Sequence, residues 1–473
     1  MNHETETIKN ELLGQKFFFN QENYKMLEKD SICAFFSANK FKWFKTNKTG
    51  IDILEKLQGT KTLNEIINEI AEEYELPYEI CKKDIIEFCQ DLIKRKIIFK
   101  DAMESKECEK PYDKIQRLYI DITNECYFTC KYCNKLVTCK KDEIKELSPG
   151  SMEKIMQKLS PWLTKSSRVC LTGGEPLLHK DLEQLLNIII KYTKNIAIWT
   201  SGENIEQNIN IIKKYCNLVF LSMDTFNQEL NNEIRGKGAF ETAVNAAKVC
   251  DENSIKFLHT ITLNKYNVNE NLEEFIPFSA KLGSLGVILN QEILIKQNNK
   301  KLKEHFNYEK NNYIQFLQAA SKKILLVSSW DTKKHRGLGN NFLFLRGIDI
   351  CRNSLAKIQP KINCSLGINE LHISVDEEVF PCHALHIEKL KIDHINNYTL
   401  DTEKIIKTRE IDKCNECYLN IICLSGCRTS GYYNNEDLYS FFNNCNFEKE
   451  SLEYSVFRTM SRPLKRKVKK INT

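Results

Sequence analysis

Six short apolar segments alternate with amphipathic stretches of helix length across the middle of this 473-residue chain. Their lengths and β-branched side chains predict strands at 118–122, 169–172, 196–200, 218–222, 257–262 and 286–290. A helix after each strand predicts a parallel sheet, and six such units predict an α/β fold, a partial (β/α)6 barrel over residues 116–300. Chemistry in such a barrel takes place at the carboxyl ends of the strands. The side chains that follow the six segments are therefore the first candidates for a functional site.

Residues 1–105 predict a separate small domain. Apolar runs at 17–19, 32–36 and 97–99 indicate strands, and three amphipathic segments between the last two runs indicate helices. Thr62 and Glu65 have the spacing of a capping box at the start of the second helix. Strands, three helices and a closing strand predict a winged-helix-like arrangement.

The rest of the chain divides by composition. Residues 301–360 are rich in Lys and Asn and form a bridging region without an assigned role, and residues 451–473 form a basic tail. Residues 361–450 are dense in cysteine and too irregular to fold around an apolar core alone, so we expect metal clusters to cross-link them.

Charge and hydropathy exclude some classes of partner. The net charge of +6 is a mild bias and gives no argument for a nucleic-acid partner. No stretch approaches the ~20 apolar residues of a membrane span. The first residues lack the basic and apolar pattern of a signal peptide, so we expect a cytoplasmic protein.

Cysteine is the unusual component, because nineteen is far above ordinary usage for a chain of this length. Disulfides are rare in reducing cytosol, so thiolates at ligand spacing are the leading explanation. Cys126, Cys130 and Cys133 follow the first strand at CxxxCxxC spacing and can ligate three irons of a 4Fe–4S cubane, leaving the fourth iron open. A zinc knuckle with Cys139 as the fourth ligand is the alternative.

The Cys126–Cys133 segment resembles the signature loop of radical S-adenosylmethionine (SAM) enzymes, down to the aromatic Tyr132 before the last cysteine. The resemblance implies that the open iron chelates SAM and that electron transfer cleaves SAM to a 5′-deoxyadenosyl radical. Segments after later strands are similar to the family's SAM-binding motifs. Paired glycines let a ligand approach the backbone, and the carboxylate after them can hold an ammonium group. The implied SAM-binding residues are Tyr132, Gly173, Gly174, Glu175, Ser201, Ser222, Asp224 and Arg235.

Residues 361–450 resemble the SPASM module, which carries two auxiliary 4Fe–4S clusters in enzymes that mature peptides. The resemblance implies that the second cluster is held by Cys414, Cys417, Cys423 and Cys445, and the first by Cys364, Cys382 and Cys427. Segment 365–371 lacks the usual fourth ligand, so the first cluster has an open iron unless Cys351 or a non-cysteine side chain closes it. Glu377 replaces a usual glycine, which predicts a looser turn. A structural zinc ribbon at 414–427 is the alternative.

Residues 1–105 resemble the domain that binds the leader of ribosomally made, modified peptides. Such domains take an extended leader as an added strand beside a helix, and we expect segment 32–36 and the third helix to make these contacts. A plain winged-helix or DNA-binding domain is the alternative. The third helix argues against DNA, because it carries the acidic residues Glu79, Asp84, Glu87 and Asp91.

This order of modules resembles the sactipeptide maturases, which join a cysteine sulfur to an α-carbon. The resemblance implies a precursor peptide bound through its leader and an electron donor such as flavodoxin or ferredoxin. Alternatives within the class are thioethers at β- or γ-carbons, carbon–carbon cross-links, and oxidation of one Cys or Ser by a sulfatase-type maturase. A non-catalytic iron–sulfur sensor that binds peptide or DNA is the alternative outside it.

Overall fold

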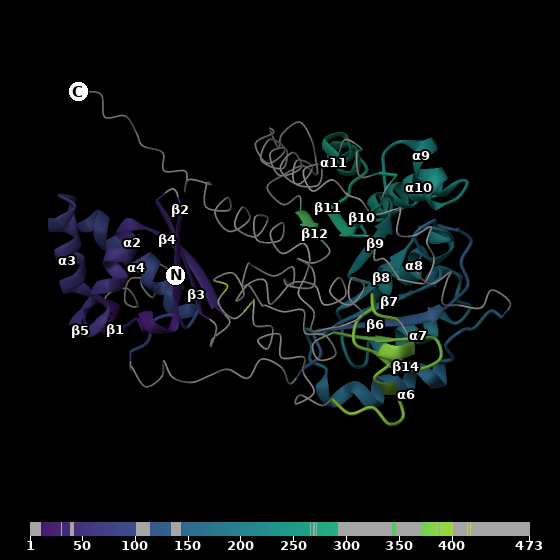
Figure 1. The fold of residues 1–473 in the computed structure, drawn as a ribbon, viewed down its shortest axis with the longest axis horizontal. Helices are drawn as coiled ribbons and strands as arrows, with labels where there is room; N and C mark the ends of the chain where they lie inside the picture. The colour runs from purple at the N-terminus through teal and green to yellow at the C-terminus, as the bar shows by residue number, and fades with distance from the viewer. Residues whose placement is uncertain are drawn as a thin grey trace.

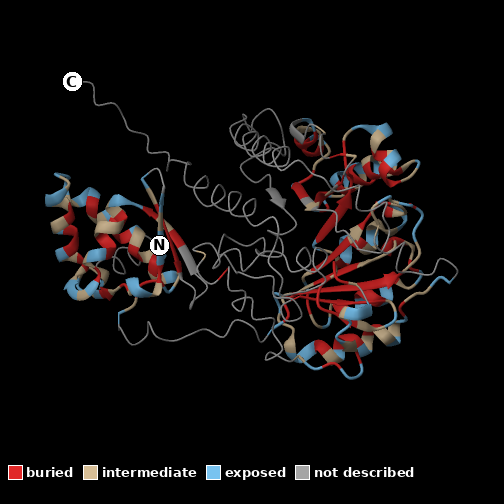
Figure 2. Cartoon of the chain, viewed as in Figure 1, coloured by how far each residue is buried: buried red, intermediate tan, exposed pale blue. Residues whose placement is uncertain are grey.

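The computed structural model describes residues 11–29, 31–37, 42–100, 114–133, 143–264, 266–267, 270, 272–291, 343–346, 370–386, 388–400, 414 and 417. One hydrophobic core lies wholly within residues 12–98 and another within residues 115–400 (Figure 2). No helix among the described residues has the length and apolar character that crossing a membrane requires.

The larger unit is built on one continuous sheet (Figure 1). Its six central strands are parallel and follow one another in chain order: β6 (Arg117–Thr123), β7 (Arg168–Gly173), β8 (Ile196–Thr200), β9 (Leu218–Ser222), β10 (Phe257–Leu263) and β11 (Gly286–Gln291). The helices between them are α6 (Pro149–Leu159), α7 (Leu182–Ile189), α8 (Ile205–Tyr215), α9 (Gln228–Arg235), α10 (Ala239–Glu252) and α11 (Leu272–Lys281). The predicted parallel α/β sheet of six strands is confirmed.

The sheet continues beyond both ends of the predicted barrel. β12 (Leu343–Arg346) pairs in parallel with β11, and β13 (Glu370–Ile373) pairs in parallel with β6. The antiparallel strands β14 (Glu378–Phe380) and β15 (Asp393–His394) complete ten strands. From the sequence, these short segments were assigned by composition to the bridging and cysteine-dense regions. They nevertheless belong to the barrel sheet.

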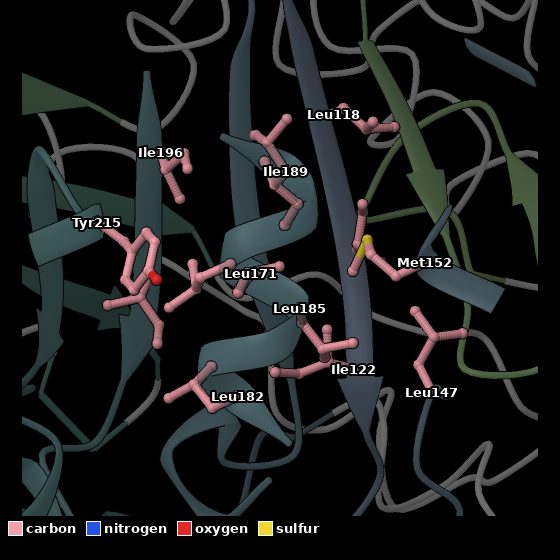
Figure 3. Close-up of a cluster of buried hydrophobic side chains, with 14 of the residues drawn as sticks. Leu118, Ile122, Leu147, Met152, Leu171, Leu182, Leu185, Ile189, Ile196 and Tyr215 are labelled. Atoms are coloured by element: carbon pink, nitrogen blue, oxygen red, sulfur yellow. The ribbon is translucent and has the colours of Figure 1, made fainter. Parts of the chain in front are cut away.

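The two faces of the sheet bury different side chains, as the period-two alternation of a strand requires. On β6, Leu118 and Ile122 face the helices and pack with Leu185 and Ile189 of α7 (Figure 3). Tyr119 faces the other way and packs in a second cluster that includes Cys170, Leu218, Phe220 and Leu258. The second face is therefore the interior of the barrel, and its upper rim carries the candidate site.

The N-terminal unit combines a small antiparallel sheet with three helices. The sheet order is β2 (Lys25–Lys29), β3 (Ile32–Ser37) and β4 (Lys42–Asn47), and β1 (Lys16–Phe18) pairs separately with β5 (Gln58–Thr62). The helices are α2 (Lys48–Lys56), α3 (Leu63–Glu73) and α4 (Tyr78–Lys94). The predicted capping box is confirmed, since Thr62 Oγ1 accepts from the Glu65 amide and Glu65 accepts from the Thr62 amide.

The expected leader-binding strand is wrong. β3, which contains residues 32–36, is the middle strand and pairs with β2 on one side and β4 on the other. Its backbone groups already form both ladders, so an added strand cannot pair with it. Within the described residues of this sheet, the outer edges of β2 and β4 are the ones that lack a neighbouring strand.

Candidate active site

The cysteine loop starts at the carboxyl end of β6 and is fastened to the neighbouring strand by backbone hydrogen bonds. The Gly174 amide donates to Thr123 O at 2.7 Å, and the Glu175 amide donates to Glu125 O at 2.6 Å. Farther along, the Lys131 amide donates to Ile234 O at 2.9 Å. The start of the loop is therefore held at the rim of the barrel, and its end is held by α9.

Gly173 and Gly174 are needed for this fastening. A Cβ atom on Gly173 would lie 2.2 Å from Thr123 O, and one on Gly174 would lie 2.0 Å from Glu125 O. Gly173 also has a φ of 131°, which side chains rarely adopt. The space that their missing side chains leave is filled by the backbone of Thr123 and Glu125, and the predicted contact of the two glycines with SAM stays a prediction.

Gly174→Ala is expected to displace the loop and weaken iron binding. The new methyl group collides with backbone at Glu125, which cannot rotate away as a side chain could. After anaerobic reconstitution, iron per chain should fall by about one cluster relative to the unaltered protein. Gly150→Ala is the matched control, because a Cβ there meets only the Ser148 hydroxyl, at 3.8 Å. Equal iron in both variants would contradict the fastening role.

The three thiols of the loop suit a cluster better than a single ion. Cys126 is exposed, and Cys130 and Cys133 are partly buried. Four sulfurs around one zinc ion lie about 3.8 Å apart, given Zn–S bonds of about 2.3 Å. The sulfur atoms of Cys126, Cys130 and Cys133 do not all lie within 4.8 Å of one another. A wider spacing is what a 4Fe–4S cubane with three cysteine ligands requires.

Desolvation favours the protonated form of two thiols of the loop, those of Cys126 and Cys130, until a metal displaces the proton. It raises the pKa of Cys126 to about 11, although the residue as a whole is exposed, and it raises the pKa of Cys130, which the Arg235 guanidinium counteracts. A coordinating metal deprotonates such thiols outright. The donor set therefore fits an iron–sulfur cluster held by Cys126, Cys130 and Cys133.

Glu175 ties the end of β7 to the end of β8. Its carboxylate is 1% exposed and accepts from Thr200 Oγ1 at 2.6 Å, from the Ser201 amide at 2.7 Å and from the Ser201 hydroxyl. Burial raises the pKa of Glu175, and the hydrogen bonds from Ser201 and Thr200 oppose that shift. Glu175 and Ser201, which were predicted separately, thus form one unit at the rim.

Asp224, Tyr132 and Arg235 form a second unit beside the cysteines. Asp224 Oδ2 accepts from the Tyr132 hydroxyl at 2.6 Å and from Arg235 Nη1 at 3.1 Å, and Arg235 Nη1 also contacts the Tyr132 oxygen. The other oxygen, Asp224 Oδ1, accepts from the Thr262 amide at 2.7 Å. Asp224 therefore connects the cysteine loop to the ends of β9 and β10.

Arg235 brings positive charge to the cysteines. Burial alone would lower the pKa of Arg235, but its ionisable neighbours Cys130 and Tyr132 and the Asp224 carboxylate hold it well above its usual value. Burial also raises the pKa of Tyr132 well above 10, so this side chain is a neutral hydrogen-bond donor to Asp224. Arg235 Nε is buried and has no hydrogen-bond partner among the described residues. A donor in this position suits an anionic group at the cysteine loop.

Asp224→Ala is expected to destabilise the protein by about 3–5 kcal/mol, because it leaves a buried guanidinium without its carboxylate. Tyr132→Phe is the matched control, since it removes one hydrogen bond from the same unit and should cost only about 1 kcal/mol. Urea unfolding of both variants measures the difference. Similar unfolding free energies for the two would show that the carboxylate does not support Arg235.

The sequence pointed to Ser222 but not to the residues that support this rim. Ser222 is 9% exposed and contacts Thr260 Oγ1 at 3.5 Å. Asn231 accepts from the Asp224 amide at 2.9 Å, and Asn267 donates to Asp224 O at 3.1 Å. Neither Asn belongs to a recognised motif: Asn267 follows the end of β10 and Asn231 lies within α9, so no local pattern indicates that both contact Asp224.

The predicted auxiliary-cluster cysteines lie only partly within the described residues. Cys382 and Cys414 are buried, Cys417 is partly buried, and the Cys417 amide donates to Cys414 O at 3.1 Å. The other four lie outside the described residues: Cys364, Cys423, Cys427 and Cys445. Cys382 lies at 3.3 Å from Glu370 Oε1 and at 3.9 Å from His383 Nδ1.

The turn before Cys382 is closed despite Glu377. The Glu377 amide donates to Ser374 O at 3.0 Å, and Glu377 adopts a left-handed φ of 62°. Its carboxylate pairs with Lys154 of α6. The expectation of a looser turn is wrong, because the ion pair and the hydrogen bond hold a conformation that glycine would adopt more readily.

Other cysteines behave as buried apolar side chains. Burial raises the pKa of Cys89, Cys170, Cys216 and Cys250 to about 12, which makes their thiols poor nucleophiles and poor ligands. Cys33 and Cys81 are buried as well. These surroundings are those of unreactive thiols in a protein core.

Two family models match this chain. Residues 120–278 match the radical SAM superfamily, and residues 36–98 match coenzyme PQQ synthesis protein D, PqqD. The first match covers β6 to α11, and the second extends from the end of β3 to just beyond α4.

Curated relatives align with part of the chain. It is 22% identical over 240 residues to the antilisterial bacteriocin subtilosin biosynthesis protein AlbA of Bacillus subtilis (strain 168), which covers 49% of this chain and 52% of AlbA. It is 28% identical over 173 residues to a probable GTP 3′,8-cyclase of Methanocaldococcus jannaschii, which covers 36% of this chain and 57% of the cyclase. The alignments thus span little more than half the length of these relatives.

A solved structure resembles nearly the whole chain. SuiB of Streptococcus suis bound to S-adenosylmethionine has a TM-score of 0.52 and 16% identity, and the match covers 90% of this chain and 99% of SuiB. A further SuiB structure contains the precursor peptide SuiA, with a TM-score of 0.51 and the same coverage. At this level of identity the likeness shows the fold.

Proposed function

We propose that this chain, whose residues 120–278 are a radical SAM domain and whose residues 36–98 are a PqqD-type domain, modifies a ribosomally made precursor peptide. The observation that carries the proposal is that one chain contains both features. A CxxxCxxC loop is held by backbone hydrogen bonds at the carboxyl end of a parallel sheet, and a domain of the precursor-recognition type has its own hydrophobic core. AlbA is a bacteriocin biosynthesis protein, and SuiB binds a precursor peptide, which supports a peptide as the substrate class.

The residues at the rim would have separate roles in binding the cofactors. Cys126, Cys130 and Cys133 would hold a 4Fe–4S cluster that, with SAM bound, supplies a 5′-deoxyadenosyl radical. Arg235 offers its buried Nε–H to an anion beside Cys130, which suits a carboxylate. Glu175 and Ser201 hold the ends of β7 and β8 in one arrangement, so the rim is preorganised before any ligand enters.

The remaining proposed SAM contacts surround this loop. Gly173 and Gly174 bring the backbone of β7 against the loop, and Tyr132 is fixed by its hydrogen bond to Asp224. Ser222 lies at the end of β9, two residues before Asp224. These positions line one rim of the sheet, as a single ligand site at the strand ends requires.

The cysteines after β13 are proposed to hold two auxiliary 4Fe–4S clusters in a SPASM-like module. The ligands would be Cys364, Cys382 and Cys427 for the first cluster, and Cys414, Cys417, Cys423 and Cys445 for the second. The spacing of Cys414 and Cys417 supports this role, because the backbone hydrogen bond from the Cys417 amide to Cys414 O forms a tight turn in which both thiols can reach one cluster. A flavodoxin or ferredoxin would supply electrons.

The N-terminal domain, for which we propose a winged-helix-like arrangement, would capture the leader of the peptide. An extended leader can add to the outer edge of β2 or of β4, because those edges lack a strand partner among the described residues of this sheet. Backbone hydrogen bonds would give affinity, and side-chain pockets would set the register.

The most specific form of the proposal is a thioether between a cysteine sulfur and an α-carbon of the same peptide. A hydrogen atom leaves the α-carbon, the thiol loses its proton, the sulfur–carbon bond forms, and one electron passes to an acceptor, for which the auxiliary clusters are proposed. The peptide thus loses one hydrogen pair for each bond, and no group from solvent is added.

Deuterium labelling tests which carbon reacts. A precursor peptide deuterated only at the α-carbons of its acceptor residues should transfer deuterium to 5′-deoxyadenosine, whereas a peptide deuterated only at β- and γ-carbons should not. The reverse pattern would replace the α-thioether with β- or γ-carbon chemistry or with a carbon–carbon cross-link. An absence of SAM cleavage in fully reconstituted protein would favour a non-catalytic iron–sulfur sensor.

A further inference from the structure

Three side chains from separate segments converge in the sheet beside β6. Asp121 lies on β6, His372 lies on β13, and His386 lies in the loop that follows β14. Their ligand atoms all lie within 4.8 Å of one another. The distance from His372 Nε2 to Asp121 Oδ2 is 3.0 Å, and that from His386 Nδ1 to the same oxygen is 3.9 Å.

Two residues of this triad are buried and the third is partly exposed. The side chain of His372 is 0% exposed and that of Asp121 is 6% exposed, whereas that of His386 is 17% exposed. Asp121 lies two residues after Tyr119 and therefore points to the same face of β6. Tyr119 belongs to the interior cluster and is the register partner of His372 on β13, so the triad lies on the interior face of the sheet. His386 is therefore the member of the triad that has the most contact with solvent.

Packing fixes the orientation of both imidazoles. The Phe380 ring centroid lies 6.0 Å from that of His372 and 4.4 Å from that of His386. The two imidazoles meet edge to face, with centroids 5.0 Å apart. Their nitrogens therefore reach the same carboxylate oxygen without a large loss of rotamer freedom when an ion binds.

We propose that Asp121, His372 and His386 bind a single divalent first-row transition-metal ion. Two imidazoles and one carboxylate are donors that Zn²⁺, Co²⁺ and Fe²⁺ share. With bonds of about 2.1 Å, tetrahedral ligand atoms lie about 3.4 Å apart, and the separations of 3.0 and 3.9 Å lie on either side of that value. Three protein ligands leave at least one coordination position open.

A plain Asp–His hydrogen bond accounts for only part of this arrangement. The 3.0 Å separation of His372 Nε2 from Asp121 Oδ2 is within hydrogen-bond distance, whereas the 3.9 Å separation of His386 Nδ1 from the same oxygen is beyond it. An ion bonded to all three atoms explains why both imidazoles turn toward one oxygen.

The neighbouring group of Glu370, Cys382 and His383 is a poorer site for such an ion. Arg117 Nε donates to Glu370 Oε2 at 2.9 Å, and the Arg117 charge lowers the pKa of Glu370 far below its usual value against the effect of burial. Its carboxylate is therefore already neutralised by a buried cation. The triad also contains no sulfur, so its metal is separate from the proposed iron–sulfur clusters.

Zinc binding to the reconstituted full-length protein tests the proposal. The protein is dialysed anaerobically against micromolar Zn²⁺ and desalted, and zinc and iron are counted by mass spectrometry. The unaltered protein and His394→Gln, a matched loss of imidazole from β15, should each retain about one zinc per chain. His386→Gln and His372→Gln should retain at least tenfold less at the same iron content.

X-ray absorption at the zinc edge identifies the donors independently of any variant. The proposal requires nitrogen and oxygen neighbours at about 2.0–2.1 Å and no sulfur at about 2.3 Å. Sulfur neighbours, no bound zinc, or equal zinc in His386→Gln and His394→Gln would overturn it and leave the triad as buried hydrogen-bonded packing. No arm of this test uses a peptide, so its outcome is independent of the proposed function.

Discussion

Replacing Cys126, Cys130 and Cys133 together with alanine is expected to abolish reductive SAM cleavage. The change removes all three thiols of the loop that Gly174 and Glu175 fasten to β7. Anaerobically reconstituted variant should contain about four fewer irons per chain than the roughly twelve expected from three 4Fe–4S clusters. Formation of 5′-deoxyadenosine, measured by chromatography with excess dithionite, should fall to background.

Cys216→Ala is the control for this prediction. Cys216 has a thiol whose pKa burial raises to about 12, so its loss should leave iron content and SAM cleavage unchanged. If the triple variant still cleaves SAM, the cluster that binds SAM lies elsewhere in the chain and the site described above is wrong.

Deleting residues 1–100 is expected to lower peptide modification by on the order of 10²-fold while uncoupled SAM cleavage continues, because capture raises the effective concentration of the peptide. The hydrophobic core of the first unit lies within residues 12–98 and shares no side chain with that of residues 115–400, so the remaining chain keeps its own core. Both rates are measured in one reaction, with 5′-deoxyadenosine and peptide quantified separately.

A leaderless peptide with the intact enzyme provides the matched comparison. It should be modified about as slowly as the full precursor is by the truncated enzyme, because each case lacks one half of the same contact. If the truncated enzyme modifies the full precursor at an undiminished rate, the N-terminal unit is not the recognition domain.

Local periodicity was sufficient to predict the six central strands of the barrel, because each is an apolar run bounded by turn residues. It could not predict β13, a four-residue strand of sequence Glu-Leu-His-Ile, because its partner β6 lies about 250 positions away. The same limit explains why the prediction of the leader-binding strand was wrong. Segment 32–36 was expected to accept the leader as an added strand, but in the structure β2 and β4 pair with it on its two sides.

The candidate site was predicted residue by residue but not as an assembly. Motif resemblance singled out Tyr132, Asp224 and Arg235, yet their mutual hydrogen bonds join positions up to 103 residues apart. The structural reason for a glycine at position 174 could not be predicted from the sequence either, since it depends on where Glu125 O lies in three dimensions. Long-range contacts of this kind leave no periodic signal in a single sequence.

The most direct test of peptide modification combines the reconstituted full-length enzyme, SAM, a one-electron reductant and a full-length precursor peptide, which would be sought among small reading frames near this chain's gene. The account predicts that the peptide loses a whole number of hydrogen pairs, with at least one 5′-deoxyadenosine formed for each pair, and that neither product appears when SAM is omitted. A peptide that is shown to bind the enzyme, yet keeps its mass while 5′-deoxyadenosine accumulates, would contradict the account.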